Sequence, residues 1–362
     1  EWGLPVFHIQ TEGSIPESYV PAAISYMGVG YEAEVKVRGA SSTSYPKKSY
    51  SLAFDEEELA VEGWPETRDR LVLITTFDDN SYVRQKLIFD QWQAMAEHAG
   101  QARLTPRSFF AVVYLDGAYL GLYTAVDHVD DEFLEQMGFE RQANLYKAVN
   151  HDANFYTKSN LHSGYEKKEG EPIDDFSDLD ELVAFTGGST PTELVDGAAP
   201  WLDLQEFMDW FLLVHYSESG DSAGKNSYLF HDPIGGPFRF APWDFNHAWG
   251  QNWYTARISS SNLNDFSSRN AVFAAIHAVR SDELWDRFRA LRADDGPMST
   301  AWLNAQLDAY YALIEPSAER DWAKWAQEYQ AFSRWTGHRS GAGDWQDYQG
   351  EKAYLYQWVE ER

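Results

Sequence analysis

Strand patterns and helix patterns occupy different parts of this 362-residue chain, and this segregation constrains its fold most strongly. The first part contains alternating apolar and polar residues and short apolar runs, which are typical of strands. The predicted strands cover residues 31–37, 49–54 and 71–77, and the two arms of a hairpin over 108–126 that turns at Asp116-Gly117. One helix, predicted over about 82–98, interrupts these strands.

The N-cap candidates of that helix are Asp78, Asp79, Asn80 and Ser81. Helical spacing of apolar residues dominates the second part of the chain. The helices predicted there cover residues 178–186, 201–217, 271–293, 299–314 and 317–333, with a short strand at 165–168 before them. Aromatic residues at helical spacing in the last helix indicate packing rather than a sugar-binding platform.

These patterns predict an α+β fold with two lobes. The first, over residues 1–127, is a small β-rich lobe with one inserted helix. The second, over residues 128–362, is larger, mostly helical and ends in a helical extension. Such an arrangement matches the small and large lobes of a protein kinase.

Charge and cysteine content limit the classes of function. The chain has 29 basic and 57 acidic residues, a net charge of −28, so we expect no nucleic-acid or anionic-membrane surface. The absence of cysteine excludes disulfides, thiolate zinc sites and a cysteine nucleophile. No window approaches 18 consecutive apolar residues, so the sequence predicts no membrane span. Because the numbering opens on Glu1 rather than methionine, we expect a processed or trimmed chain.

Residues 220–250 concentrate the side chains suited to chemistry. Asp221 follows a long apolar helix, and Asn226 comes five positions later. Two strands then follow, turned around residues 233–236, and the second ends on Asp244-Phe245. A helix, Asp-x-x-x-x-Asn, a hairpin and Asp-Phe is the order of parts in a protein kinase. The His-Arg-Asp and Gly-x-Gly-x-x-Gly motifs are both absent, so an ordinary protein kinase is excluded.

In a kinase the first aspartate orients the attacking hydroxyl and takes its proton, while the asparagine and the last aspartate hold magnesium. Phosphoryl transfer needs mainly alignment and charge neutralisation, and carboxylate and carboxamide oxygens suit a hard cation. The alternative is structural, because Asp221 and Asp244 could each cap a turn or helix. The ordered combination with Asn226 favours the functional interpretation.

The loop between the first two predicted strands could contact phosphates. Arg38, Ser41 and Ser42 lie in a small, flexible stretch that could present hydroxyls and backbone N–H groups. Lys47 and Lys48 would add positive charge. The alternative is a solvated hairpin loop.

Several stretches of the chain together resemble the CotH kinase family, spore-coat-type secreted kinases of bacteria with relatives in some fungi. They fall within about residues 31–250, in the expected order: 38–54, 79–92, 113–130, 144–147, 220–230 and 240–250. The resemblance implies an atypical protein-kinase fold, ATP and Mg²⁺ or Mn²⁺ as cofactors, and transfer to Ser/Thr of proteins. It also implies a secreted or surface protein as substrate and an extracellular or cell-surface location.

Residue by residue, the resemblance makes Asp221 the catalytic aspartate, Asp244 and Asn226 the metal ligands, and Lys47 or Lys48 the basic residue of the first loop. The strand after the Asp-Gly hairpin usually runs into a glutamate, and here the position is Asp127, one methylene shorter. Any nucleotide contact at Asp127 is therefore altered. Arg84, on the inserted helix, could pair with a carboxylate or remain solvated.

Three other functions remain open at this stage. The first is a kinase-like scaffold or surface adhesin that binds nucleotide without turnover. The second is a glycosidase with paired carboxylates, suggested by the many Trp and Asp residues. The third is a histidine-based metallohydrolase, which has less support because the ten histidines form no HExxH-like spacing. His247, three positions after Asp244, could touch the site or only pack beside it.

Overall fold

The computed structural model describes residues 1–54, 57–232, 234–293, 295–336 and 347–362. Residue 233, part of the predicted turn, lies outside the described residues. The strands are β1 (Val6–Thr11), β2 (Val20–Tyr26), β3 (Val29–Arg38), β4 (Ser49–Ala53), β5 (Arg70–Thr75), β6 (Ser108–Leu115), β7 (Ala118–Asp127), β8 (Asn144–Ala148), β9 (Tyr165–Glu169), β10 (Ser227–His231) and β11 (Arg239–Pro242).

The α-helices are α1 (Arg84–Ala99), α2 (Asp131–Gln136), α3 (Ser177–Gly188), α4 (Pro191–Asp196), α5 (Leu204–Ser217), α6 (Ala271–Val279), α7 (Ser281–Leu291), α8 (Thr300–Ala331), α9 (Ser333–Thr336) and α10 (Tyr348–Glu361). The described residues also form the 3₁₀ turns η1 (Ser41–Ser44), η2 (Gly220–Ser222) and η3 (Ser267–Arg269). The hairpin at Asp116-Gly117 and the strands expected near 31–37, 49–54, 71–77 and 165–168 are confirmed.

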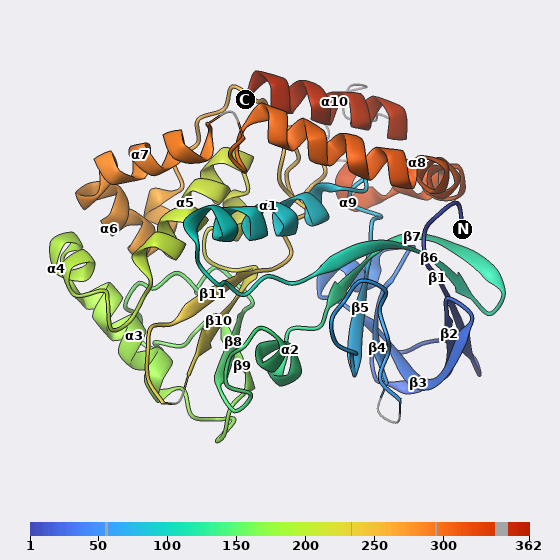
Figure 1. Ribbon diagram of the computed structural model, residues 1–362, viewed down its shortest axis with the longest axis horizontal. Helices are drawn as coiled ribbons and strands as arrows, with labels where there is room; N and C mark the ends of the chain where they lie inside the picture. Colours follow the sequence, from blue (N-terminus) through green and yellow to red (C-terminus); the bar gives the residue numbers. More distant parts are fainter. Residues whose placement is uncertain (55–56, 233, 294, 337–346) are drawn as a thin grey trace.

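The N-terminal strands close into a barrel with the order β1-β2-β3-β4-β5-β7-β6 (Figure 1, right). Neighbouring strands are antiparallel except β1 and β6, which pair in parallel with Val6 opposite Val112. Alternate side chains point inward and form the barrel core: Phe7, Ile9, Ile24, Val35, Leu52, Leu73, Val113, Tyr123 and Ala125. The α+β class is confirmed, but the expected small kinase-type sheet is instead a closed barrel. The sequence interpretation missed β1 and β2, which supply its closing strands.

The second sheet has the order β11-β10-β8-β9 with all neighbours antiparallel, and helices surround it (Figure 1). The inserted helix α1 leaves the barrel and joins this second body. Its apolar face, including Leu87, Ile88, Trp92 and Met95, is buried in the same core as Trp210 of α5. The two bodies are therefore connected through shared packing as well as through the chain between β7 and β8.

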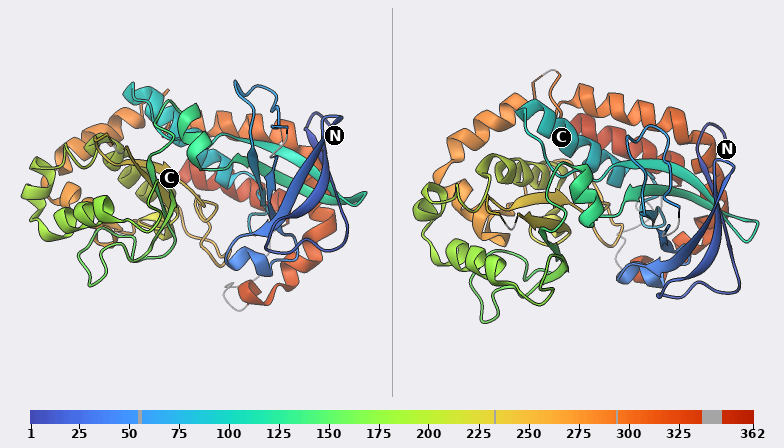
Figure 2. Two further views of the ribbon diagram at one scale, coloured as in Figure 1. Left: turned by 90° about the horizontal axis from the view of Figure 1, so that it is seen from below. Right: turned by 60° about the horizontal axis from the view of Figure 1, so that its bottom comes forward.

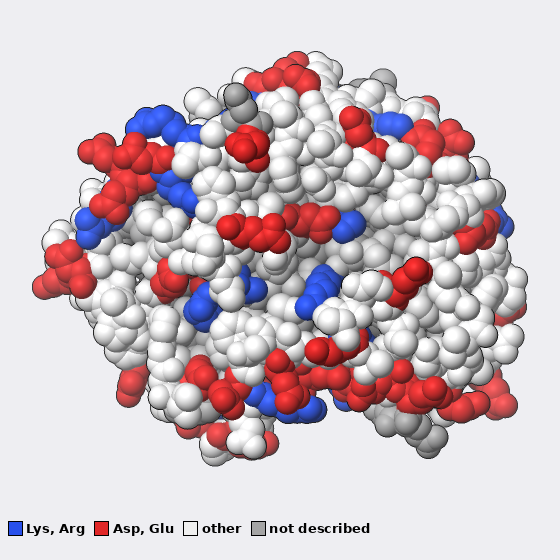
Figure 3. Space-filling view, in the orientation of Figure 1, with Lys and Arg blue, Asp and Glu red and all other residues white. Residues whose placement is uncertain are grey.

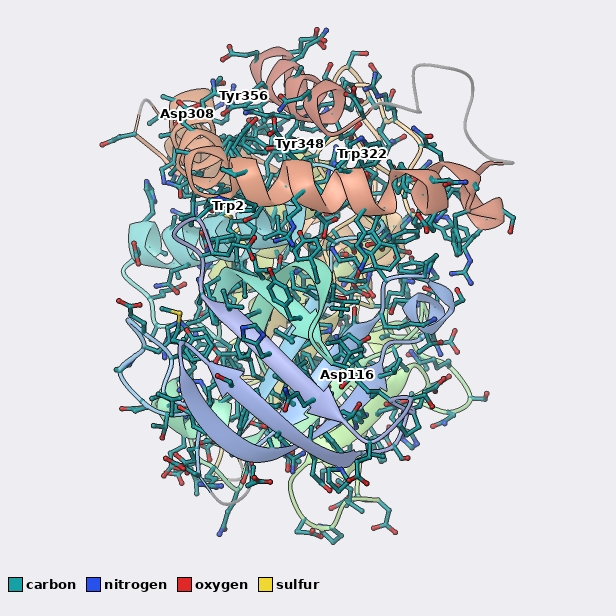
Figure 4. All side chains as sticks on the ribbon, turned by 90° about the vertical axis from the view of Figure 1, so that its right-hand side faces the viewer. Trp2, Asp116, Asp308, Trp322, Tyr348 and Tyr356 are labelled. Carbon is teal, nitrogen blue, oxygen red and sulfur yellow. The ribbon has the colours of Figure 1, made fainter. Side chains whose placement is uncertain are left out.

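The C-terminal helices lie over both bodies (Figure 2). Two helices were predicted on either side of residue 315, but the structure has one 32-residue helix, α8, with Pro316 inside it. The parts of α8 that carry Asp308 and Trp322 point in different directions (Figure 4). Proline lacks the N–H for one i→i−4 bond and bends a helix without necessarily ending it. The bend directs the second part of α8 over the barrel.

Two further helix predictions differ from the structure. The helix expected over 271–293 divides at Arg280 into α6 and α7, and α10 was not anticipated. The N-cap of α1 is Val83 rather than any residue of 78–81, but the Asp79 carboxylate accepts the Arg84 N–H at 3.0 Å. The Asp79 carboxylate therefore accepts a hydrogen bond from a free backbone N–H at the start of α1, although Asp79 is not the N-cap residue.

Acidic side chains outnumber basic ones over the face shown in Figure 3, most densely along its lower rim. This distribution agrees with the net charge of −28. Among the helices of the described ranges, none combines the length and apolarity needed to cross a membrane.

Candidate active site

The loop after α5 holds Asp221 in a well-packed turn. The loop begins as α5 ends at Glu218, whose φ is +57°, and η2 then carries Asp221. The Trp210 indole donates to the Ser222 carbonyl at 3.0 Å, and a Cβ on Gly220 would lie 2.3 Å from the Phe266 ring. These contacts leave the loop backbone little freedom, so the position of Asp221 is defined.

Asn226 lies directly against Asp221. Its Nδ2 donates to Asp221 Oδ2 at 3.2 Å, and Lys225 Nζ lies 3.0 Å from the same oxygen. His151 Nε2 lies 3.5 Å from Asp221 Oδ1. The backbone of Asn226 has φ +59° and donates its N–H to the Ala148 carbonyl at 3.2 Å. Asp221 and Asn226, the two ends of the Asp-x-x-x-x-Asn motif, are therefore in direct contact.

Asp244 lies at the end of β11, beside this pair. The residue before it, Trp243, donates its N–H to the Asn226 carbonyl at 3.1 Å, so the hairpin joins the two segments. Asp244 is exposed, has φ +58° and makes no hydrogen bond or ion pair with the described residues. Left-handed backbone at non-glycine residues is strained and concentrates at functional sites. Both proposed metal ligands, Asn226 and Asp244, have it.

His247 interacts electrostatically with both site aspartates, Asp221 and Asp244. Burial acts to lower the pKa of His247, but Asp78, Asp244 and Asp221 together raise it above its ordinary value. The nearest of these is Asp78, whose Oδ2 lies 3.4 Å from His247 Nε2. The direct contacts of His247 are with Asp78 and Asn246, while the charges of Asp244 and Asp221 act on it from farther away.

Asp78 is a site component that the sequence interpretation treated only as an N-cap candidate. Its Oδ2 accepts from Tyr45 Oη at 3.1 Å and from Asn246 Nδ2 at 2.7 Å. Its carbonyl accepts from Gln251 Nε2 at 2.6 Å. Burial and the Asp78 charge raise the Tyr45 pKa. Asp78 therefore fixes the segment after Asp244 to the loop between β5 and α1.

The predicted phosphate loop divides into parts near the site and parts away from it. The Arg38 guanidinium, at the end of β3, lies 5.4 Å from the centroid of the Trp243 ring, next to Asp244. Ser41 and Ser42 form η1, and a Cβ on Gly39 would lie 1.9 Å from Ser42 Oγ. Lys48 Nζ donates to the Thr43 carbonyl at 2.7 Å, within the same loop. The structure thus places Arg38 over Trp243, the residue before Asp244, while the Lys48 ammonium donates within the loop and the Lys48 carbonyl accepts from Tyr123 Oη at 2.9 Å.

Lys47 and Asp127 are fully buried in separate ion pairs. Lys47 Nζ lies 2.5 Å from Asp321 Oδ2 of α8. Asp127 Oδ1 lies 2.7 Å from Arg68 Nε, and burial raises the Asp127 pKa. The structure does not bring either residue to the Asp221–Asn226 pair, so a nucleotide contact for them stays a prediction.

Arg84 pairs with two carboxylates, which decides between the two alternatives that the sequence left open, pairing and solvation. Its NH1 lies 2.6 Å from Asp79 Oδ1, and its NH2 lies 2.7 Å from Glu351 Oε1 of α10. Arg84 therefore fastens α1 to the C-terminal helix.

Lys147 is a candidate site residue that the sequence interpretation left unassigned. It is half-buried on β8, and its Nζ lies 5.8 Å from the centroid of the Tyr228 ring. Burial and the neighbouring Arg38 lower its pKa to about 8, while Asp244 acts in the opposite direction. The available signal was a lysine directly after the apolar pair Leu145-Tyr146, in the stretch 144–147 that carries part of the family resemblance.

The donor set beside the hairpin fits a magnesium-type cation. Asp244 offers an unpaired carboxylate, and Asn226 offers an amide oxygen while its nitrogen faces Asp221. Hard cations prefer such oxygen ligands. Within the described ranges, this region included, no group of three or more His, Cys, Asp or Glu side chains has metal-binding geometry, so Asn226 and Asp244 would be two protein ligands among several.

Comparison with known proteins places this site in a family. The chain is 26% identical over 249 residues to inner spore coat protein H of Bacillus subtilis (strain 168). The match covers 67% of this chain and 65% of that protein, so the chain spans about two thirds of the relative's length. The family model described as CotH kinase protein matches residues 35–362, which include the barrel from β3 onward, the Asp221–Asp244 segment and the C-terminal helices. The chain therefore belongs to the CotH family.

Proposed function

We propose that the protein is a metal-dependent kinase that transfers the γ-phosphoryl group of ATP to Ser/Thr hydroxyls of protein substrates. The observation that carries this proposal is the connected geometry of three residues. Asn226 contacts Asp221 through its side chain and holds the residue before Asp244 through its backbone. The bilobal kinase architecture, with the barrel as the small lobe, is part of the same proposal.

In the proposed mechanism, Asp221 orients the acceptor hydroxyl and accepts its proton. Lys225, 3.0 Å from Asp221 Oδ2, stabilises the carboxylate before this transfer. Asn226 and Asp244 would hold Mg²⁺ or Mn²⁺, which supplies neutralisation of the phosphate charge. The left-handed backbone and the Trp243 hydrogen bond keep these two ligands in place, so little reorganisation accompanies substrate binding.

A labelling experiment tests this function. The protein is incubated with Mg²⁺ or Mn²⁺, a panel of Ser/Thr-containing proteins and ATP labelled at either the γ- or the α-phosphate. We expect γ-label transfer that falls at least about 100-fold in Asp221→Ala and Asp244→Ala. Asp286→Ala, an exposed carboxylate on α7, is the matched control. Equal labelling in the wild type and both site variants would reject the proposal, and α-label transfer would indicate a nucleotidyltransferase instead.

The relative's name supports a second candidate. Because the matched protein is a coat protein, this chain could serve as a surface or coat scaffold that binds nucleotide without turnover. Nucleotide with metal should then raise the melting temperature by mass action while no label is transferred. Under either function we propose a secreted or surface location.

A further inference from the structure

Two neighbouring basic side chains in the region of Asp244, Lys147 and Arg38, make no direct ion pair within the part of the chain that the structure describes. Neither the Lys147 ammonium nor the Arg38 guanidinium makes a hydrogen bond or an ion pair with the described residues, and each lies beside an aromatic ring instead. Acidic residues outnumber basic ones by 57 to 29 in this chain, so partners are abundant. Lys168, on the adjacent strand β9, does pair with Glu166 at 2.6 Å.

The arrangement of Lys147 is unfavourable in the ligand-free fold. Its ammonium is half-buried and lies near a second positive charge, and both effects favour the neutral form. A partly buried charge that makes no direct ion pair costs free energy, which the more distant charges of Asp244 and Glu166 offset only in part. Lys47 differs, because its three ammonium hydrogens all have oxygen acceptors. A cation that destabilises the free protein is expected where an anionic ligand binds.

The position of the two cations matches the metal ligands. In the β8–β10 register Lys147 lies opposite Tyr228, and its neighbour Ala148 accepts the Asn226 N–H. Arg38 reaches the same region from β3 of the barrel and lies over Trp243, next to Asp244. The cations thus come from the two bodies of the fold and lie beside two adjacent rings, Tyr228 and Trp243, whose centroids are 5.5 Å apart.

We propose that Lys147 and Arg38 form the phosphate clamp of this protein and hold the polyphosphate of a nucleoside triphosphate. This inference rests on the proposed function and names the residues that would bind its nucleotide. The planar Arg38 guanidinium can donate two parallel hydrogen bonds to one phosphate, while Lys147 supplies a point charge. Lys47 is then a structural residue, although it lies in the basic stretch that sequence reasoning favoured.

Binding measurements with matched variants test the clamp. Titration calorimetry with ATP and Mg²⁺, and separately with tripolyphosphate, compares the wild type with Lys147→Met, Lys147→Arg and Arg38→Met. We expect Lys147→Met and Arg38→Met each to weaken ATP binding about 10- to 100-fold. Lys147→Arg should recover most of the affinity because it keeps the charge. Lys352→Met, which removes a partly exposed lysine paired with Glu315 on the far helices, should bind as the wild type does.

Thermal unfolding without ligand separates a binding role from a structural one. Because Lys147→Met removes a partly buried charge that neighbouring carboxylates compensate only in part, its melting temperature should equal or exceed that of the wild type. A lower melting temperature with unchanged affinity would overturn the inference.

The outcomes also distinguish this inference from the proposed function. Equal ATP affinity in the wild type and Lys147→Met would refute the clamp and leave the kinase proposal intact. Tripolyphosphate binding that depends on Lys147, without phosphoryl transfer, would support the clamp and refute the kinase. Failure of the wild type to bind either probe would refute both.

Discussion

The buried ion pair between Lys47 and Asp321 connects the loop before β4 to α8, and breaking it should destabilise the whole protein. Lys47 Nζ donates to Asp321 Oδ2 at 2.5 Å, to the Leu122 carbonyl at 2.6 Å and to Thr76 Oγ1 at 2.9 Å. Asp321 Oδ2 also accepts the Leu122 N–H at 2.7 Å. The second part of α8, which carries Trp322, runs across the barrel strands (Figure 4).

Both side chains are almost fully buried, with exposed fractions of 0% and 3%, so removing one partner leaves the other charge unpaired. Breaking a buried pair in this way costs about 3–5 kcal/mol. We therefore expect Lys47→Met and Asp321→Leu each to lower the free energy of unfolding by that amount. The double variant removes both charges, so its loss should be about 2–3 kcal/mol smaller than the sum of the single losses.

Urea denaturation followed by tryptophan fluorescence measures these differences, with equal m-values required for the comparison. Asp321→Asn is a useful intermediate, since its amide oxygen can still accept the Leu122 N–H while the charge is lost. Losses below about 1 kcal/mol in both single variants, or additive losses in the double variant, would contradict the assignment of Lys47 as a structural cation.

Three further predictions concern single residues. Gly121→Ala should lower the free energy of unfolding by more than about 1 kcal/mol, because Gly121 has φ +151° and a Cβ there would lie 2.2 Å from Asp321 Oδ2. An unchanged midpoint of urea denaturation would show that Asp321 does not pack closely against Gly121. Arg84→Met should cost about 3–5 kcal/mol, since it removes the buried cation between Asp79 and Glu351 and leaves Glu351 only its longer contact with Arg257 at 3.6 Å; an unchanged melting temperature in calorimetry would contradict this. Lys147→Met should exceed the wild type in stability by up to about 3 kcal/mol at pH 7, from a pKa lowered from 10.5 to about 8. Because the unfolded state binds more protons between those values, wild-type stability should rise from pH 8 to 10.5 and the difference should close; a constant difference across this range would refute the pKa argument.

The sequence by itself determined the local elements and the order of the chemical groups. Alternation and helical spacing located most strands and helices, since each reflects which side of a single element is buried. The Asp116-Gly117 turn was predictable because its backbone favours those residues. Asp221, Asn226 and Asp244 could be selected together because a fixed spacing and one hairpin, all within 25 positions, bring them into one region.

Only the tertiary structure decided how these elements close upon one another. The barrel closes because β1 pairs with β6, about a hundred positions away, and periodicity within either strand does not name its partner. The pairing of Lys47 with Asp321 spans 274 positions. The local sequence does not show that Lys47 and Lys147 differ in role. Burial beside the Asp321 carboxylate makes Lys47 a structural residue. Lys147 instead is partly buried near Arg38 and makes no direct ion pair with the described residues. The difference arises because the charge state of an ionisable group depends on every group packed around it.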